Sequence, residues 1–115
     1  MQERRSDKRM LCAELVEILW EHDGRHFRRI ANLEDISLSG ICLHLEKPIP
    51  AGTRIIMRYR DGQLCGTIRY CVFREIGYFL GIQLEENCRW SSLHFRPEHL
   101  VDPSELMQQS IARHS

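Results

Sequence analysis

Hydrophobic and polar residues alternate with a period of two along most of the chain up to Glu85, a pattern that indicates strands with one buried face. The buried sets predicted in this way are Ile41, Leu43 and Leu45; Ile55, Met57 and Tyr59; Leu64, Ile68, Tyr70 and Val72, with Gly66 among them; and Tyr78, Leu80, Ile82 and Leu84. The stretch from Leu11 to Trp20 changes phase near Leu15 and Val16, which predicts a bulge or a strong twist. The stretch 25–34 alternates poorly but has the length of a further strand.

Turn signals separate these runs. Asp23-Gly24 and Asp61-Gly62 are hairpin dipeptides, because glycine accepts the positive φ of a primed turn. Glu75-Ile76-Gly77 predicts a third tight connection, and the segment 48–52, with two prolines, predicts a loop because proline cannot donate to a strand ladder. Six strands joined mostly by hairpins predict an all-β fold, a six-stranded antiparallel β-barrel or a sandwich.

The C-terminal residues change character. In Asp102-Pro103-Ser104-Glu105 the aspartate can cap a helix, proline suits its first position, and the glutamate follows three residues after the cap. Leu106, Met107 and Ile111 then lie at the spacing of one helical face. We therefore expect a short helix from Pro103 to about Arg113, and three parts overall: an arginine-rich arm (1–10), a barrel domain (11–100) and a helical tail (101–115).

Length and composition narrow the class of protein. The 115 residues fit one domain, and no run of about 18 apolar residues predicts a membrane-spanning helix. No apolar stretch of a secretory signal follows the first residues, so we expect a cytoplasmic protein whose five cysteines are reduced. The formal net charge of zero disfavours a broad nucleic-acid-binding surface. Of the 16 basic residues only Lys8 and Lys47 are lysines, however, and arginine is the residue suited to bidentate recognition of phosphate and base edges.

Two segments could carry binding chemistry. The first is Arg4-Arg5-Ser6-Asp7-Lys8-Arg9, where Arg5 and Arg9 lie four residues apart. A guanidinium presents a rigid fork of donors that can grip a phosphate or the O6/N7 edge of guanine. The alternative interpretation is a solvated charge run, as is common near chain ends.

The second segment is Asp35-Ile36-Ser37-Leu38-Ser39-Gly40. In extended backbone Asp35 and Ser37 share a face, where a carboxylate can accept from the N1–H and N2–H of guanine and a hydroxyl can bond a phosphate or a base. Gly40 permits a turn or a close approach of backbone. The alternative is a polar turn in which Asp35 and Ser37 bond their own backbone.

Taken together, the two segments resemble the PilZ domain family, the bacterial receptors for cyclic di-GMP. The family pattern is Arg-x-x-x-Arg followed further along the chain by Asp/Asn-x-Ser-x-x-Gly, and Arg5, Arg9, Asp35, Ser37 and Gly40 match it without substitution. Gly52 precedes a strand in the usual place, and the stretch 78–84 looks like the closing strand of the family. The resemblance covers roughly Glu3 to Glu85 and implies a six-stranded barrel of the split-barrel type, often followed by a helix.

The resemblance also implies a ligand and a mechanism. Cyclic di-GMP would be held by Arg5 and Arg9 of the arm and by Asp35 and Ser37 of the barrel, with Gly40 as a backbone position. Arg4 matches the extra arginine that often precedes the motif and can contact a second ligand molecule, so we expect an intercalated dimer of the nucleotide. Because the arm has no apolar residue between Met1 and Met10, binding is expected to order it and to relay the signal to an unknown protein partner.

Other functions are less well supported. An adaptor of the same fold that acts through protein contacts alone would typically lack these motifs, and a barrel that binds RNA or single-stranded DNA would need more positive charge. Neither Ser37 nor Ser39 has a partnering His/Asp arrangement, so we expect no enzyme and no cofactor besides the ligand. The pairs Cys42/His44 and Cys65/Cys71 match no standard zinc site, so packing roles are expected and no metal is predicted. A monomer and a homodimer both remain open, as does the downstream pathway.

Overall fold

The computed structural model describes residues 8–60, 62–88, 90–91 and 95–104. These residues form six strands and one 3-10 turn: β1 (Met10–His22), β2 (Arg25–Ile36), β3 (Gly40–Leu45), β4 (Arg54–Tyr59), β5 (Gly62–Arg74), β6 (Gly77–Leu84) and η2 (Glu86–Cys88). The all-β prediction and the number of strands are therefore confirmed for the described residues.

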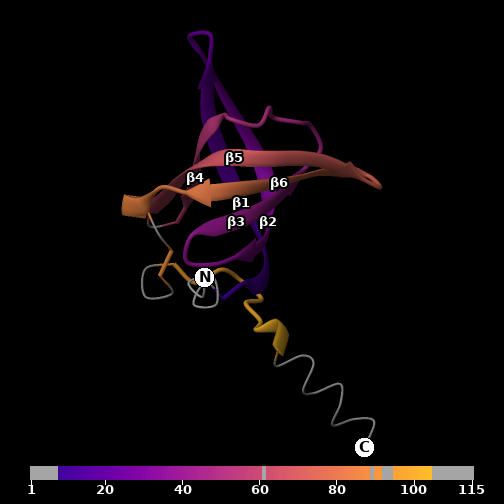
Figure 1. The fold of residues 1–115 in the computed structure, drawn as a ribbon, viewed down its shortest axis with the longest axis vertical. Coiled ribbons are helices and arrows are strands. Elements are labelled where there is room, and N and C mark those ends of the chain that lie inside the picture. Colours follow the sequence, from indigo (N-terminus) through magenta and orange to yellow (C-terminus); the bar gives the residue numbers. More distant parts are fainter. Residues whose placement is uncertain (1–7, 61, 89, 92–94, 105–115) are drawn as a thin grey trace, which may run out of the picture.

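All neighbouring strands are antiparallel and close into a barrel in the order β1-β2-β3-β6-β5-β4 (Figure 1). The topology is two three-stranded meanders, β1-β2-β3 and β4-β5-β6, connected by the segment 46–53. Pairing of β3 with β6 forms one seam between the meanders, and pairing of β1 with β4 at Glu17–Leu19 forms the other. Because the barrel is closed, the paired parts of the strands have no free sheet edge.

The predicted turns lie where expected. Asp23 and Gly24 have φ values of 52° and 76°, as a type I′ hairpin requires of its two central residues. Glu75, with φ 56°, follows the last residue of β5 directly, so β5 and β6 are joined by a two-residue connection. The segment 48–52 is a loop, in which Gly52 has φ 92°. Asp61 lies outside the described residues.

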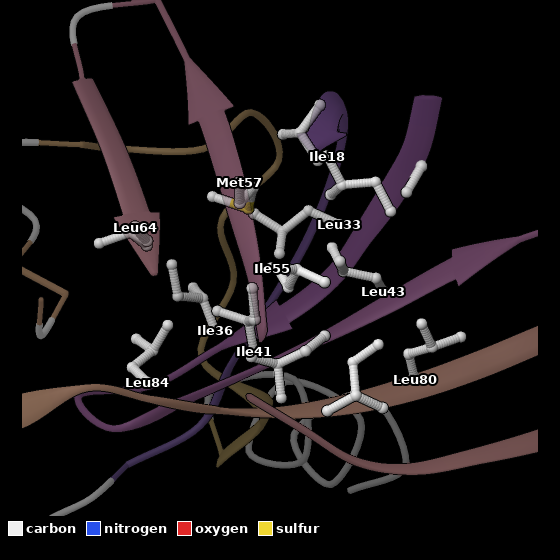
Figure 2. Packing of buried hydrophobic residues seen from close by; sticks show 14 of the residues in the cluster. Ile18, Leu33, Ile36, Ile41, Leu43, Ile55, Met57, Leu64, Leu80 and Leu84 are labelled. Carbon is white, nitrogen blue, oxygen red and sulfur yellow. The ribbon is translucent and has the colours of Figure 1, made fainter. Parts of the chain in front are cut away.

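One continuous core fills the barrel (Figure 2). The fully buried side chains at its centre come from every strand: Ile18, Leu33, Ile36, Ile41, Leu43, Ile55, Met57, Ile68 and Leu80. The alternation therefore assigned the inward faces of β3, β4 and β6 correctly. Ring stacking of Tyr59 on Phe95, with centroids 4.1 Å apart, extends the core to the chain after β6.

Register shifts occur in three strand pairs, at Leu11/Glu14, Leu33/Asp35 and Ile68/Tyr70, and the first and last of them bear on the predicted phase. In β1 the register shifts between Leu11 and Glu14, so the predicted irregularity exists but lies nearer the start of the strand than Leu15. In β5 the register shifts between Ile68 and Tyr70, because Ile82 and Gly81 of β6 oppose them consecutively. Burial of Tyr70 and Val72 was therefore a wrong prediction: their exposed fractions are 49% and 36%. The extra residue, Arg69, turns everything after it to the opposite face.

The segment after β6 returns to the start of β1. Leu11 and Val101 exchange backbone hydrogen bonds of 2.8 and 2.7 Å, and Ala13 donates to the carbonyl of Glu98 at 3.0 Å. The carboxylate of Asp102 accepts the N–H of Ser104 at 2.9 Å, which agrees with the predicted capping role of Asp102. The predicted helix lies, beyond Ser104, outside the described residues. No helix in the part of the chain covered by the structure is long and apolar enough to cross a bilayer.

Replacement of Leu33, which has no exposed surface, should show how strongly the core stabilises the barrel. We expect Leu33→Ala to lower the free energy of unfolding by about 2–5 kcal/mol, because the lost apolar contacts leave a cavity. Leu15→Ala is the matched control, since Leu15 is 71% exposed and should change stability by about 0.5 kcal/mol or less. Urea denaturation followed by circular dichroism measures both. Equal effects of the two substitutions would contradict the assigned faces.

Candidate functional site

The Asp-x-Ser-x-x-Gly motif forms the tight connection between β2 and β3. The backbone N–H of Ser37 donates to the carbonyl of Gly40 at 2.8 Å. In return, the Ser37 hydroxyl accepts the N–H of Gly40 at 3.1 Å and lies 3.2 Å from its carbonyl oxygen. Ser37 is only 1% exposed, so these bonds satisfy a buried hydroxyl. The serine thus fixes the shape of the turn.

Gly40 lies at a close approach of two backbone segments. A Cβ atom at this position would lie 3.2 Å from the carbonyl oxygen of Ile82 in β6 and 3.9 Å from a guanidinium nitrogen of Arg9. The turn is also tied to β6 by a 2.8 Å hydrogen bond from the Leu84 N–H to the Ser39 carbonyl. We refer to residues 37–40 as the Ser37–Gly40 turn. The turn is therefore held both by its own hydrogen bonds and by a hydrogen bond from β6.

Two ion pairs place the residues that precede β1. The guanidinium of Arg9 pairs with the carboxylate of Asp35, which lies two residues before Ser37. The side chain of Asp35 is 17% exposed, whereas that of Arg9 is 54% exposed. One residue earlier, Lys8 pairs with Asp102 at 2.6 Å, and this bond with that from Ser104 lowers the pKa of Asp102 to about 2. Arg9 is therefore held beside the Ser37–Gly40 turn.

Burial and a neighbouring charge have opposite effects on the carboxylate of Asp35. Burial raises the pKa of Asp35 above its ordinary value of 3.8, while the charge and hydrogen bond of Arg9 act in the opposite direction. Cys42 lies directly opposite Asp35 in the β2–β3 register, and burial together with that carboxylate raises its pKa to about 11. Burial also raises the pKa of Tyr70, with smaller effects from Cys42, Arg9 and Asp35. Four titratable side chains thus share one neighbourhood.

A shallow depression of about 200 Å³ lies between the Ser37–Gly40 turn and the strands β5 and β6. We call it the polar depression; its lining includes Arg9, Ser37, Gly40, Arg69, Tyr70 and Gln83. The ring of Tyr70 lies over Gly81, where a Cβ atom would be only 2.1 Å from the ring. The guanidinium of Arg69 donates to the side-chain oxygen of Gln83. The depression therefore combines two guanidinium groups with an exposed aromatic ring.

Three other depressions in the described part of the chain are larger, and two of them matter for the comparison with the predicted site. One of about 480 Å³ lies on the other side of the turn and is lined by Lys8, Met10, Leu38, Trp90, Arg96 and Leu100, among others. The largest, about 780 Å³, lies between the β1–β2 hairpin and the loop 50–53. It contains Trp20 stacked on Phe27, with centroids 5.3 Å apart, and none of the residues predicted for ligand binding.

The structure brings Arg9, Asp35, Ser37 and Gly40 together, as the motifs predicted. Arg4 and Arg5 lie outside the described residues. Sequence reasoning missed Arg69 and Tyr70, because strict alternation placed Tyr70 in the core. The alternation carried no signal for the β5 bulge, since Arg69 lies on the outward face under strict alternation as well.

The chain is a small all-β domain: a closed six-stranded antiparallel barrel that carries arginines on a polar surface beside the Ser37–Gly40 turn. A family model described as "PilZ domain" matches residues 3–91, and the chain belongs to this family. PilZ domains are generally receptors for cyclic di-GMP and not enzymes. No curated protein matches the chain significantly.

Stability should depend on pH through Asp35. Because its pKa is raised on folding, the folded protein binds this proton more tightly than the unfolded chain does. The contribution of Asp35 to the free energy of unfolding should therefore decrease as pH rises from about 3.8 through the folded pKa. Urea denaturation of the wild type and Asp35→Asn, from about pH 3 to about pH 6, measures this contribution as the difference between the two.

Asp102→Asn is the control of opposite sign. The pKa of Asp102 is lowered from 3.8 to about 2, so its stabilising contribution is complete above the ordinary value and is lost as pH falls toward 2. If wild type instead became more stable relative to Asp35→Asn as pH rises, the Arg9 ion pair would outweigh the burial of Asp35.

Proposed function

We propose that this PilZ domain is a receptor that binds cyclic di-GMP across the polar depression. The observation that carries the proposal is the meeting of Arg9 and Asp35 beside the Ser37–Gly40 turn, in a chain of this family. Cyclic di-GMP is a compact dianion with two guanine bases. A guanidinium fork suits its phosphates and the O6/N7 edge of guanine, and a carboxylate suits the N1–H and N2–H donors.

Binding would exchange one set of charged hydrogen bonds for another. Without ligand, Arg9 and Asp35 satisfy each other. A guanine that donates to Asp35, with a phosphate or base edge that accepts from Arg9, would replace this pair without leaving either charge alone. That exchange favours a ligand that offers donors and acceptors together, because removal of one partner alone would leave a poorly solvated carboxylate unpaired.

The size of the depression supports a role for the residues before Lys8. Pockets that enclose a small ligand measure about 300–1,000 Å³, whereas the polar depression measures about 200 Å³. The barrel alone would therefore leave much of a dinucleotide uncovered. In our proposal Arg5 and Arg4 of the arm supply the missing contacts from the open side. The depression of about 480 Å³ beyond the turn offers room for a second ligand molecule.

Ser37 and Gly40 would act mainly through the backbone. The hydroxyl of Ser37 is already engaged with Gly40, and a side chain at Gly40 would approach the carbonyl oxygen of Ile82 closely. These two residues therefore keep the turn in the form that presents Asp35 beside Arg9. Tyr70 and Arg69 extend the proposed site, since an exposed ring can stack on a base and a guanidinium can bind a phosphate.

The relay to a partner protein would use the ordering of the arm over this surface. An apolar surface for such a partner exists at the tip of the β5–β6 hairpin, where Phe73 and Ile76 are 60% and 84% exposed. The same observation supports the second candidate function, an adaptor that acts by protein contacts alone. Nucleotide binding distinguishes the two.

Isothermal titration with cyclic di-GMP tests the receptor proposal, with GTP and cyclic di-AMP as ligand controls. We expect selective binding that Arg5→Ala or Arg9→Ala abolishes, because each removes charge-assisted contacts of about 1.5–3 kcal/mol apiece. Arg28→Ala is the matched control: Arg28 pairs with Glu17 and does not line the polar depression. Both variants should remain folded at the temperature of the titration, although Arg9→Ala leaves Asp35 unpaired and should unfold at a lower temperature than the wild type.

The stoichiometry of the same titration tests the nucleotide dimer. Two ligands per chain are expected, and Arg4→Ala should reduce this number toward one. One ligand per wild-type chain would rule out the dimer, and an absence of binding would favour the adaptor.

Tyr70→Ala should weaken cyclic di-GMP binding by about 1–3 kcal/mol, the value of one stacked base. Phe73→Ala is the control, because Phe73 is an exposed aromatic residue of the same hairpin that does not line the polar depression. Titration of both variants under identical conditions gives the comparison. Equal affinities would show that the ring of Tyr70 does not contact the ligand.

A further inference from the structure

A cluster of two thiols and a carboxylate lies outside the polar depression. Cys65, Glu85 and Cys88 place their Sγ and carboxylate oxygen atoms within 4.8 Å of one another. None of the three residues lines the polar depression, so the cluster is separate from the proposed nucleotide site.

The fold brings these residues together through the end of β6. The N–H of Glu85 donates to the carbonyl of Cys65 at 2.9 Å, which continues the β5–β6 ladder by one residue. The η2 turn then reverses the chain, with the N–H of Cys88 donating to the carbonyl of Glu85 at 2.8 Å. This reversal returns Cys88 to Cys65, although they are far apart in sequence. The sequence pairs Cys42/His44 and Cys65/Cys71 did not anticipate this contact.

We propose that Cys65, Cys88 and Glu85 bind a divalent cation that prefers sulfur ligands, of which Zn²⁺ is the type. Zinc takes thiolate ligands at about 2.3 Å and carboxylate oxygens at about 2.0–2.2 Å. In a tetrahedral arrangement those bond lengths put the ligand atoms roughly 3.5–3.8 Å apart. The observed separations, all within 4.8 Å, need a contraction of about 1 Å or less, within reach of side-chain rotation.

Arg54 gives the cluster a partner and balances its charge. Its Nε donates to one oxygen of Glu85 at 2.5 Å and its Nη2 to the other at 3.2 Å. Carboxylates that bind metals are commonly oriented by such outer hydrogen bonds. Two thiolates and one carboxylate carry three negative charges, which a divalent cation and the guanidinium of Arg54 neutralise. A thiol pair without the carboxylate would lack this balance.

The cation would have three ligands from the described residues and a fourth position open to solvent. Cys65 is buried at 5% exposure, whereas Cys88 and Glu85 are partly exposed and leave a path for the ion. Three protein ligands plus one exchangeable position is an arrangement that zinc accepts.

Titration with Co²⁺ in the presence of a phosphine reductant tests the proposal, because Co²⁺ occupies zinc sites and reports thiolate ligation by a sulfur-to-metal charge-transfer band. We expect one equivalent to produce the band and Zn²⁺ to remove it. Cys88→Ser and Cys65→Ser should lose the band, and Glu85→Gln should weaken Co²⁺ binding by about tenfold or more. Cys71→Ser, a change at another partly buried thiol of β5, should keep both band and affinity.

Two results would overturn the proposal: fully reduced wild type that gives no charge-transfer band, or a band that persists at full strength in Cys88→Ser. Cys88 lies in a partly exposed turn, so this variant remains informative even if Cys65→Ser fails to fold. Thermal unfolding without metal verifies the fold of each variant. Because the readout needs no nucleotide, failure of this proposal is independent of the failure of cyclic di-GMP binding.

Discussion

Gly40 is the point on which the arrangement of the site depends. Its backbone is hydrogen-bonded to Ser37 on one side and pressed against Ile82 of β6 on the other. A hydroxyl that is almost fully buried must have partners, and those of Ser37 are the N–H and carbonyl groups of this glycine. These bonds hold the turn in the observed form, in which Asp35 lies near the end of β2, beside the start of β1. Arg9 is paired with that carboxylate, and so the position of the arginine proposed to bind the ligand depends on a glycine of another strand.

The same arrangement costs stability. Asp35 is largely buried and its pKa is raised, which means that the fold does not fully compensate the desolvation of its carboxylate. Buried ionisable groups that lower the stability of the fold are typical of functional sites, and the stability they cost is supplied by other parts of the protein. Here it is supplied by a core that spans all six strands. Lys8 and Asp102 behave in the opposite way, because their pair lowers the pKa of the carboxyl and secures the chain next to Arg9.

Much of this could be predicted from the sequence, for a physical reason. The buried faces of β3, β4 and β6 follow from strict alternation, and the hairpins follow from residues that accept positive φ. The resemblance of the two motifs to the PilZ family predicted that Arg9, Asp35, Ser37 and Gly40 belong to one site, and the structure brings these four residues together. Alternation failed at Tyr70, since one extra residue in β5 inverts every later side chain. The contact of Cys65 with Cys88 was also beyond the sequence, because it depends on a 3-10 turn that returns the chain on itself.

The closed barrel limits how a bound ligand could act. Every strand is hydrogen-bonded along both edges over part of its length, and the core side chains at the centre have almost no exposed surface. Such packing shifts between discrete arrangements and does not deform gradually. A ligand on the polar depression would therefore change the groups around it, above all the Arg9–Asp35 pair, and leave the β3–β6 seam intact. For this reason the response is expected in the residues before Lys8 and not in the strands that carry the site.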